Sequence, residues 1–420
     1  METILAPFQM LFNKVLRNKS FLFLWGGQIF SQLANNALNF ALAVLVFSVT
    51  KSSTSIGLLF VSIGLPAVLF GSMAGVFCDR FNKKTILVLS SLARAILVII
   101  FLLGYTSLPV LLITVFLIST NMQLFAPAEA SLIAIMINKR SLMLANSLFS
   151  FTFQASMIAG YALASLIIAS FQVTGYTVVF GLSFLGFLFA AISCFLITLP
   201  VHEQPPQHVQ TVKHVFHDLI DGWKFVGRNQ SIMKPLGDMT TIAGAITFLF
   251  VLAPALAETL LQQKVEDATP FVLVPATVGI VFGIIGLRLI KDRFSKENLI
   301  RIGLLMTAFG IICIPLISFF PEKHLPLFML IAGVTFFNPL VSVPAISLLQ
   351  ERTPAQYRGR VFGVMNMLLN SVSAFPALII GALTDLLGVY VVVIVGGGAF
   401  FLYTLLWKKT PTDHQSTAHH

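Results

Sequence analysis

The sequence predicts an all-α membrane protein with twelve transmembrane helices in two pseudo-symmetric six-helix bundles. Three observations carry this prediction. Hydrophobic residues make up 57% of the 420 residues and charged residues only 10%, whereas a soluble domain carries about 25% charged residues. Apolar runs recur at roughly the 20 residues that an α-helix needs to cross a bilayer. A charged pentapeptide also occurs twice, which indicates an internal duplication.

The apolar runs define the spans in chain order. Six are expected before a polar centre, at residues 21–47, 55–77, 85–104, 109–137, 142–171 and 175–199. Six are expected after it, at residues 232–260, 269–289, 299–319, 326–349, 361–386 and 389–407. Period-2 alternation is absent and the strands of a membrane barrel would be far shorter, so the spans are predicted to be helices.

Positive charge is distributed unevenly over the loops of this topology. If the N-terminus is cytoplasmic, nearly all of the 26 Lys and Arg residues fall on the cytoplasmic side. Lys51, Lys264 and Lys323 fall on the other side, and Arg94 lies within a span. The positive-inside rule therefore places both termini in the cytoplasm. The net charge of +10 reflects this orientation, and no nucleic-acid partner is expected.

The polar centre divides the chain into domains. We expect an N-terminal bundle at residues 1–199, a cytoplasmic linker at 200–231, a C-terminal bundle at 232–407 and a cytoplasmic tail at 408–420. Within the linker, residues 209–226 alternate apolar and polar side chains with a helical period, which is typical of an amphipathic helix at the membrane surface. This helix either only connects the bundles or has a regulatory role.

The duplication is visible in two repeated segments. Asp79-Arg80-Phe81-Asn82-Lys83 returns as Asp292-Arg293-Phe294-Ser295-Lys296, after the second and the eighth span. Phe125-Ala-Pro127 is echoed by Phe337-Asn-Pro339 at almost the same offset. Each echo lies in the fourth span of its bundle, where proline can kink a helix.

The first of these loops carries a family resemblance. The run from Gly75 to Lys84, with Asp79-Arg80 and the basic pair Lys83-Lys84, resembles the loop signature of the major facilitator superfamily. Asn82 takes the place of the usual glycine, and Asn tolerates positive φ better than most residues. The linker from Asp218 to Phe225 and the stretches 144–148 and 357–363 are similar to the bacterial efflux branch with macrolide and enterobactin exporters.

The resemblance implies a gating role for the charged loops. In the family, the loop charges latch one conformation of the transporter, and seven residues of this chain correspond to these loops. They are Gly75, Asp79, Arg80, Lys83 and Lys84, with Asp292 and Arg293 in the second copy. The alternative is that these charges only orient the helix hairpins.

Polar side chains inside the spans are candidates for a substrate cavity, because each needs a partner or water in the membrane. In the first span, Gln28, Gln32, Asn35 and Asn39 are separated by three or four residues and therefore share one face. Asn366 and Asn370 form a shorter stripe in the eleventh span. The alternative for both stripes is hydrogen bonding between helices.

Three buried charges are candidates for proton coupling. Arg94 and Glu129 each lie about nine residues into a span, roughly 14 Å deep, and the two spans are consecutive, so an ion pair is expected. The pair is either static or a switch in which a protonated carboxyl releases the arginine. Asp238, near the start of the seventh span, is the third candidate.

Other classes of chemistry lack sequence support. Neither a phosphate-binding loop nor a cluster of zinc ligands occurs, so we expect neither an enzyme nor a bound cofactor or metal. The cysteines Cys78, Cys194 and Cys313 lie in or beside predicted spans, so disulfides are not expected.

The resemblance implies a monomeric antiporter of the bacterial inner membrane that exports amphipathic or hydrophobic molecules, as multidrug efflux proteins do. The coupling ion, proton or sodium, stays open. Gly160 is followed by Tyr161 where related exporters often carry Gly-Pro, and Asn35-Asn36 stands where they often carry an acidic residue. Two alternatives remain. Ala34-Asn35-Asn36-Ala37-Leu38 also resembles lysophospholipid transporters of the superfamily, and a transport-inactive receptor is the other possibility.

Overall fold

The computed structural model describes residues 16–104, 107–171, 173–198, 212–262, 270–354 and 357–406. Every regular element in these ranges is helical, as predicted. Within them, ten helices are long and apolar enough to cross a membrane, and two shorter apolar helices lie at the positions of the eighth and twelfth predicted spans. The predicted fold class is confirmed.

The first half of the chain forms six helices that match the predicted spans to within a few residues. They are α2 (Lys19–Thr50), α3 (Ser53–Arg80), α4 (Lys83–Leu102), α5 (Leu108–Met136), α6 (Lys139–Phe171) and α7 (Val173–Phe195). The linker helix is α8 (Val212–Arg228).

The second half repeats the pattern with two interruptions. Its helices are α9 (Gln230–Leu261), α11 (Pro270–Ile290), α12 (Lys296–Cys313), α13 (His324–Phe336), α14 (Asn338–Arg352), α15 (Arg358–Leu387) and α16 (Val389–Leu405). A 3₁₀ segment, Ile314–Phe319, completes the ninth span. The tenth span is broken between α13 and α14 at Phe337, two residues before Pro339.

The variable residue of the duplicated pentapeptide is a helix cap in both copies. The side chain of Asn82 accepts hydrogen bonds from the backbone N–H groups of Lys84 and Thr85 at the start of α4. Ser295 accepts one from Asn298 at the start of α12. Asn and Ser are among the best N-caps. Asn82 has φ −65°, so its capping oxygen explains its presence, and tolerance of positive φ does not.

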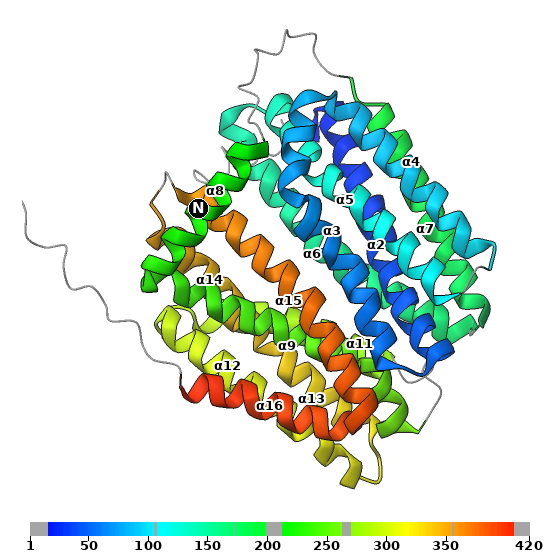
Figure 1. The fold of residues 1–420 in the computed structure, drawn as a ribbon, viewed down its shortest axis with the longest axis vertical. Coiled ribbons are helices and arrows are strands. Elements are labelled where there is room, and N and C mark those ends of the chain that lie inside the picture. The colour runs from blue at the N-terminus through cyan, green and yellow to red at the C-terminus, as the bar shows by residue number, and fades with distance from the viewer. Residues whose placement is uncertain are drawn as a thin grey trace, which may run out of the picture.

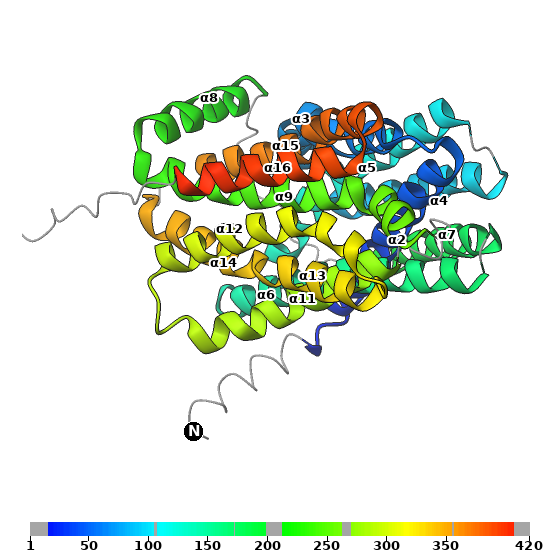
Figure 2. The same cartoon turned by 90° about the horizontal axis from the view of Figure 1, so that it is seen from below.

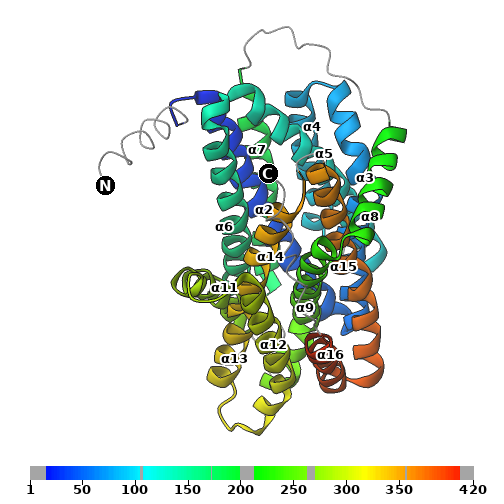
Figure 3. The same ribbon diagram turned by 90° about the vertical axis from the view of Figure 1, so that its left-hand side faces the viewer.

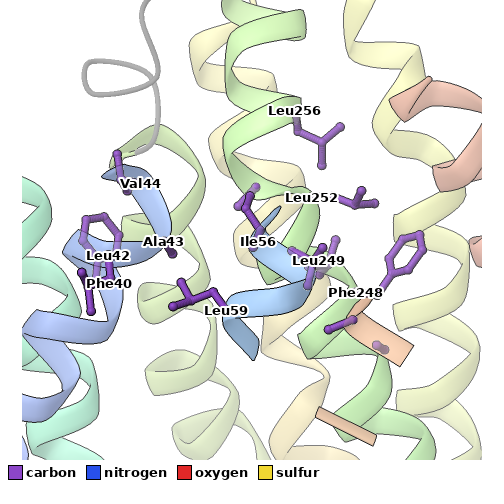
Figure 4. Packing of buried hydrophobic residues seen from close by; sticks show 14 of the residues in the cluster. Phe40, Leu42, Ala43, Val44, Ile56, Leu59, Phe248, Leu249, Leu252 and Leu256 are labelled. Atoms are coloured by element: carbon purple, nitrogen blue, oxygen red, sulfur yellow. The ribbon is translucent and has the colours of Figure 1, made fainter. Parts of the chain in front are cut away.

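The bundle has two chemically different ends. The basic end carries Lys83, Lys84, Arg293 and Arg352, and the Lys51 end carries Lys51, Glu258 and Asp385. A hydrophobic core connects the two halves toward the Lys51 end. In Figure 4, Ile56 and Leu59 of α3 lie beside Leu249 and Leu252 of α9. The halves are therefore packed together at this end.

Small residues allow α3 and α15 to approach closely between the halves (Figure 1). A Cβ atom at Gly57 would lie 2.6 Å from the Cα atom of Leu378. One at Gly64 would lie 2.7 Å from the Cβ atom of Ala374. Any larger side chain at either glycine would force the two halves apart. A second contact between the halves joins α6 and α11, which lies at the lower end of α6 in Figure 3.

The linker helix lies outside the two bundles. Figure 1 shows α8 crossing the direction of α15 near the basic end, and Figure 2 shows it beyond α15 and α16. It packs mainly on α15 and also touches α3. The predicted amphipathic helix is thus present, whereas residues 199–211 and the predicted tail lie outside the described residues. The domain boundaries remain predictions.

Candidate functional site

A pocket of about 220 Å³ lies between the two halves of the chain. Helices α3 and α6 of the first half form one wall, and α9, α11 and α13 of the second half form the other. The residues that determine its chemistry are Phe60, Tyr161, Thr247, Phe250, Thr277 and Thr335. Because both halves contribute, a relative movement of the halves would change the shape of this pocket.

Aromatic rings from both halves meet in this pocket. Phe250 packs edge-on against Phe60 with 5.5 Å between ring centroids, and lies 5.3 Å from the ring of Tyr161. Such geometries are favourable beyond the burial of area. Phe40 of α2 continues the cluster behind Tyr161, at 6.2 Å. The aromatic groups thus hold the halves together while forming an apolar surface.

The polar groups of the pocket are hydroxyls. Thr335 donates to the backbone oxygen of Ile331, and Thr247 donates to Ser373 at 3.4 Å. All residues that line the pocket are uncharged. A ligand here would be recognised by apolar and aromatic contact with few hydrogen bonds, as in many small-molecule sites.

The predicted polar stripe of α2 lies elsewhere and divides into two parts. Gln28 and Gln32 are buried, and Gln28 donates to the backbone oxygen of Phe149 in α6 at 3.1 Å. Asn35 and Asn39 are half-buried. The Gln28 bond supports the interhelical alternative for its part of the stripe. Neither pair belongs to the lining of the central pocket, so a cavity role remains a prediction.

The shorter stripe of α15 is more open. Asn366 is exposed and Asn370 is half-buried, and Asn370 donates to the backbone oxygen of Asn366 at 2.8 Å. These two residues also lie outside the lining of the central pocket. Their assignment to a cavity likewise remains a prediction.

Arg94 is fully buried inside the first half. Its guanidinium donates to Ser31 at 2.9 Å, to Ser91 at 3.2 Å and to the backbone oxygen of Ser90. The rings of Phe125 and Phe187 each lie with centroids 4.8 Å from the guanidinium carbon. A cation held by two aromatic faces gains cation–π attraction, which is largest in a desolvated site.

Glu129 lies near Arg94 without pairing with it. The two side chains interact electrostatically, but the ion pairs found among the described residues do not include the expected one between them. The Oε1 atom of Glu129 is buried and has no hydrogen-bond partner. Cys194 of α7 completes the group as a neighbour of both charges. The carboxyl group is therefore poised to change its interactions.

Asp238 lies in a different environment in the second half. It is buried and accepts a hydrogen bond from the hydroxyl of Tyr403 at 3.2 Å. Lys234, one turn earlier in α9, interacts electrostatically with Asp238 and with Glu297. Glu297 in turn forms an ion pair with Arg352 at 2.5 Å. Asp238, Lys234, Glu297 and Arg352 thus each have an oppositely charged neighbour.

The gating-loop residues are only partly described. Gly75, Asp79 and Arg80 lie at the end of α3, but their side chains are outside the described residues. Lys83 is buried, and Lys84 lies over the ring of Phe195 at 5.2 Å. In the second copy, Asp292 and Arg293 are exposed. Their gating role remains a prediction.

Asp385 forms a contact between the halves that the sequence did not single out. Its carboxylate accepts hydrogen bonds from the hydroxyls of Ser52 and Thr54 and from the backbone N–H groups of Ser53 and Thr54, at 2.6–2.9 Å. The acceptor lies at the N-terminus of α3, where the helix dipole favours a negative charge. Nearby, Lys51 and Glu258 form an ion pair at 2.8 Å across the halves.

A metal site does not emerge within the described ranges, because His, Cys, Asp and Glu do not gather there in groups of three. The candidate site is therefore an apolar pocket between two membrane-spanning halves. Each half also contains a buried charged residue, Arg94 in the first and Asp238 in the second. This arrangement is that of a multi-pass membrane transporter.

Comparison with known proteins agrees. Residues 24–378 match the family described as Major Facilitator Superfamily, and the chain belongs to this family. It is 26% identical over 382 residues to YfiS, an uncharacterised transporter of this type in Bacillus subtilis (strain 168), covering 88% of each chain. It is 21% identical over 382 residues to macrolide efflux protein A of Streptococcus pyogenes, covering 87% of this chain and 89% of that protein.

Solved structures show the same fold. The nucleoside transporter NupG has a TM-score of 0.69 at 14% identity, covering 92% of this chain and 100% of that one. A bacterial homologue of the human lysosomal transporter Spinster has a TM-score of 0.67 at 14% identity, covering 94% of this chain and 99% of that one. At this identity the likeness concerns the fold alone.

Proposed function

We propose that this transporter exports hydrophobic or amphipathic small molecules by alternating access, in exchange for protons. The observation that carries the proposal is the uncharged aromatic pocket between the halves, formed around Phe60, Tyr161 and Phe250. Such a surface suits drug-like molecules, and it would leave the charges of phosphorylated metabolites without partners. The relationship to a macrolide efflux protein supports the outward direction.

The charge distribution supports a membrane orientation, and the contacts between the halves support one conformational state of the transport cycle. Under the positive-inside rule, the basic end faces the cytoplasm of a bacterial cell. The halves are packed together at the opposite end, through Asp385, the Lys51–Glu258 pair and the glycine contacts of α3. The proposed state is therefore closed to the outside. Opening to the outside requires these contacts to separate.

Glu129 is the proposed proton acceptor. Its buried Oε1 atom lacks a hydrogen-bond partner, and the positive charge of Arg94 lies nearby between Phe125 and Phe187. Protonation of Glu129 in α5 would remove its electrostatic attraction to Arg94 in α4. The loss of this attraction would change the packing of α4 against α5. Arg94 would remain held by Ser31 and Ser91.

A second candidate function is transport of lysophospholipid. An apolar groove of about 500 Å³ runs between α9, α15 and α16, and its lining residues Leu383, Val391 and Val395 are exposed. The groove runs from Val391 to Tyr403 along α16, about 18 Å at 1.5 Å per residue. This length and composition suit one acyl chain.

Transport into proteoliposomes with imposed pH or sodium gradients tests the proposal. The substrates are an ethidium-type dye, a macrolide and a lysophospholipid, and uptake driven by the pH gradient is expected for the dye or the macrolide. Uptake of the lysophospholipid alone would favour the second candidate. Absence of gradient-driven movement of any of the three would contradict transport of these classes.

Two variants, each with a matched control, test proton coupling and substrate binding separately. Glu129→Gln is expected to abolish proton-driven transport with the protein still folded, whereas Glu322→Gln, at an exposed carboxylate, is expected to have no effect. Phe250→Ala is expected to reduce thermal stabilisation by the dye in detergent, whereas Phe319→Ala, at a side chain 83% exposed, is not. Unimpaired proton-driven transport by Glu129→Gln would refute the coupling role.

A further inference from the structure

The linker helix α8 is fixed to the transporter by one face. Gly222 lies so close to α15 that a Cβ atom there would be 3.0 Å from the backbone oxygen of Arg360. Phe225 stacks on Tyr357 with 4.0 Å between ring centroids and 8° between ring planes. Arg360 also pairs with Asp221 at 3.6 Å. These three contacts determine which face of α8 points away from the bundle.

The opposite face of α8 carries a stripe of exposed apolar and basic side chains. Ile220 is 49% exposed and Trp223 is 41% exposed. Lys224 and Arg228 are also exposed. The four residues follow one another at intervals of three, one and four, so they lie together on one side of the helix. We call Ile220, Trp223, Lys224 and Arg228 the α8 stripe.

The position of the helix indicates what contacts this stripe. Helix α8 lies at the basic end, across the direction of α15 (Figure 1). A helix crossing the ends of membrane spans lies at the level of the lipid headgroups. Tryptophan is enriched at this level, and long basic side chains keep their charge in water while their stems lie on apolar surface.

We propose that the α8 stripe binds anionic phospholipid headgroups of the surrounding bilayer. Ile220 and Trp223 would enter the boundary between headgroups and acyl chains, and Lys224 and Arg228 would contact the phosphates. Helices that combine these residue types bind anionic membrane surfaces. The occupant is the bilayer itself, because the transporter is embedded in it.

This contact has a consequence for the transport cycle. Helix α8 is fixed to α15 and also touches α3 of the other half. A lipid-bound α8 therefore holds the basic end of α15 at the membrane surface. The proportion of anionic lipid would in this way influence how readily α15 separates from α3.

The experiment uses full-length protein carrying Trp25→Phe and Trp407→Phe, so that Trp223 is the remaining tryptophan. The protein is placed in bilayers in which either phosphatidylglycerol or phosphatidylcholine carries bromine, which quenches nearby tryptophan. Brominated phosphatidylglycerol is expected to quench Trp223 more strongly. Lys224→Gln with Arg228→Gln is expected to weaken this preference by roughly 25-fold, since each basic residue near an anionic surface contributes a factor of about five in affinity.

Lys291→Gln with Arg301→Gln provides the control, because it removes the same charge from exposed positions away from α8. This variant is expected to keep the preference. Equal quenching by both lipids, no quenching by either, or a preference unaffected by the α8 substitutions would overturn the proposal. Amide exchange of α8 in the unmodified protein gives a second measurement. It is expected to slow in bilayers with phosphatidylglycerol, and equal exchange with and without this lipid would contradict the contact.

Discussion

The two halves of this transporter hold their buried charges in different ways. In the first half, Arg94 is enclosed by Phe125 and Phe187, and its nearest carboxyl group, that of Glu129, is not hydrogen-bonded to it. In the second half, Arg352 pairs directly with Glu297, nearer the surface. The interaction between Arg94 and Glu129 can therefore change with the protonation of Glu129, whereas Arg352 and Glu297 neutralise each other in a direct ion pair.

The two fourth spans differ as well. Pro127 lies inside α5, which continues through it, whereas the tenth span breaks at Phe337 before Pro339. In contrast, the pentapeptide turns behave alike, with Asn82 and Ser295 capping the next helix. The two halves therefore share the capped turns at the starts of α4 and α12, while their fourth spans differ.

The largest predicted effect concerns Arg94. Arg94→Ala removes the hydrogen bonds to Ser31 and Ser91 and leaves a cavity between the rings of Phe125 and Phe187, so it should lower stability by about 2–5 kcal/mol, the usual range for a large-to-small change in a core. Thermal unfolding in detergent measures this. Arg352→Ala should have a much smaller effect in the same assay. Equal losses in the two halves would remove the contrast between them.

The next effect concerns the aromatic enclosure. Phe187→Leu removes one face of the cation–π site and should destabilise the protein by about 2 kcal/mol more than a similar change elsewhere. Phe248→Leu in the second half is the control, since Phe248 is also buried but packs edge-on against Phe400. The comparison is made by thermal unfolding. A similar loss for both variants would mean that packing alone explains Phe187.

The caps test what the halves share. Asn82→Ala and Ser295→Ala should each destabilise the protein by about 1 kcal/mol, the usual contribution of an N-cap side chain. The midpoint of chemical unfolding in detergent gives the two values. Asn82→Ser is expected to be nearly neutral, because both residue types cap well. A large difference between the halves would show that the turns have diverged too.

The smallest effect is expected for Tyr403. Tyr403→Phe removes its hydrogen bond to Asp238, and hydrogen bonds between membrane helices contribute about 0.6 kcal/mol on average. Unfolding measured against the parent protein should detect this small change. A decrease in the free energy of unfolding above about 2 kcal/mol would mean that the buried charge of the second half depends on its partner as strongly as that of the first half does.

Much of the fold could be predicted because bilayers impose simple rules. The spans followed from the lengths of apolar runs, and the equivalent turns followed from the pentapeptide repeat. The depths of Arg94 and Glu129 could be estimated from residue counts, and the two do lie near each other. Their ion pair was not found, because depth along a helix says nothing about the direction in which a side chain points.

The residues of the central pocket and the Asp385 contact carried no usable sequence signal. Phe60, Tyr161 and Phe250 form the pocket, but the chain contains 40 phenylalanines, and apolar residues in a membrane protein face lipid, helices and cavities alike. From the sequence, Asp385 could be placed only at the end of a helix, where it would face water. Its role depends on the approach of α3 to α15, which places the start of one helix beside the end of another.

The sequence by itself determined the helices, the turns between them and the family, because these depend on local composition and on nearby residues. Tertiary structure alone decided which side chains meet. The rotation of each helix about its axis and the packing of one half on the other bring Phe250 to Tyr161 and Asp385 to Ser53. Those contacts join residues far apart in the chain, and their geometry is set by the packing of whole helices.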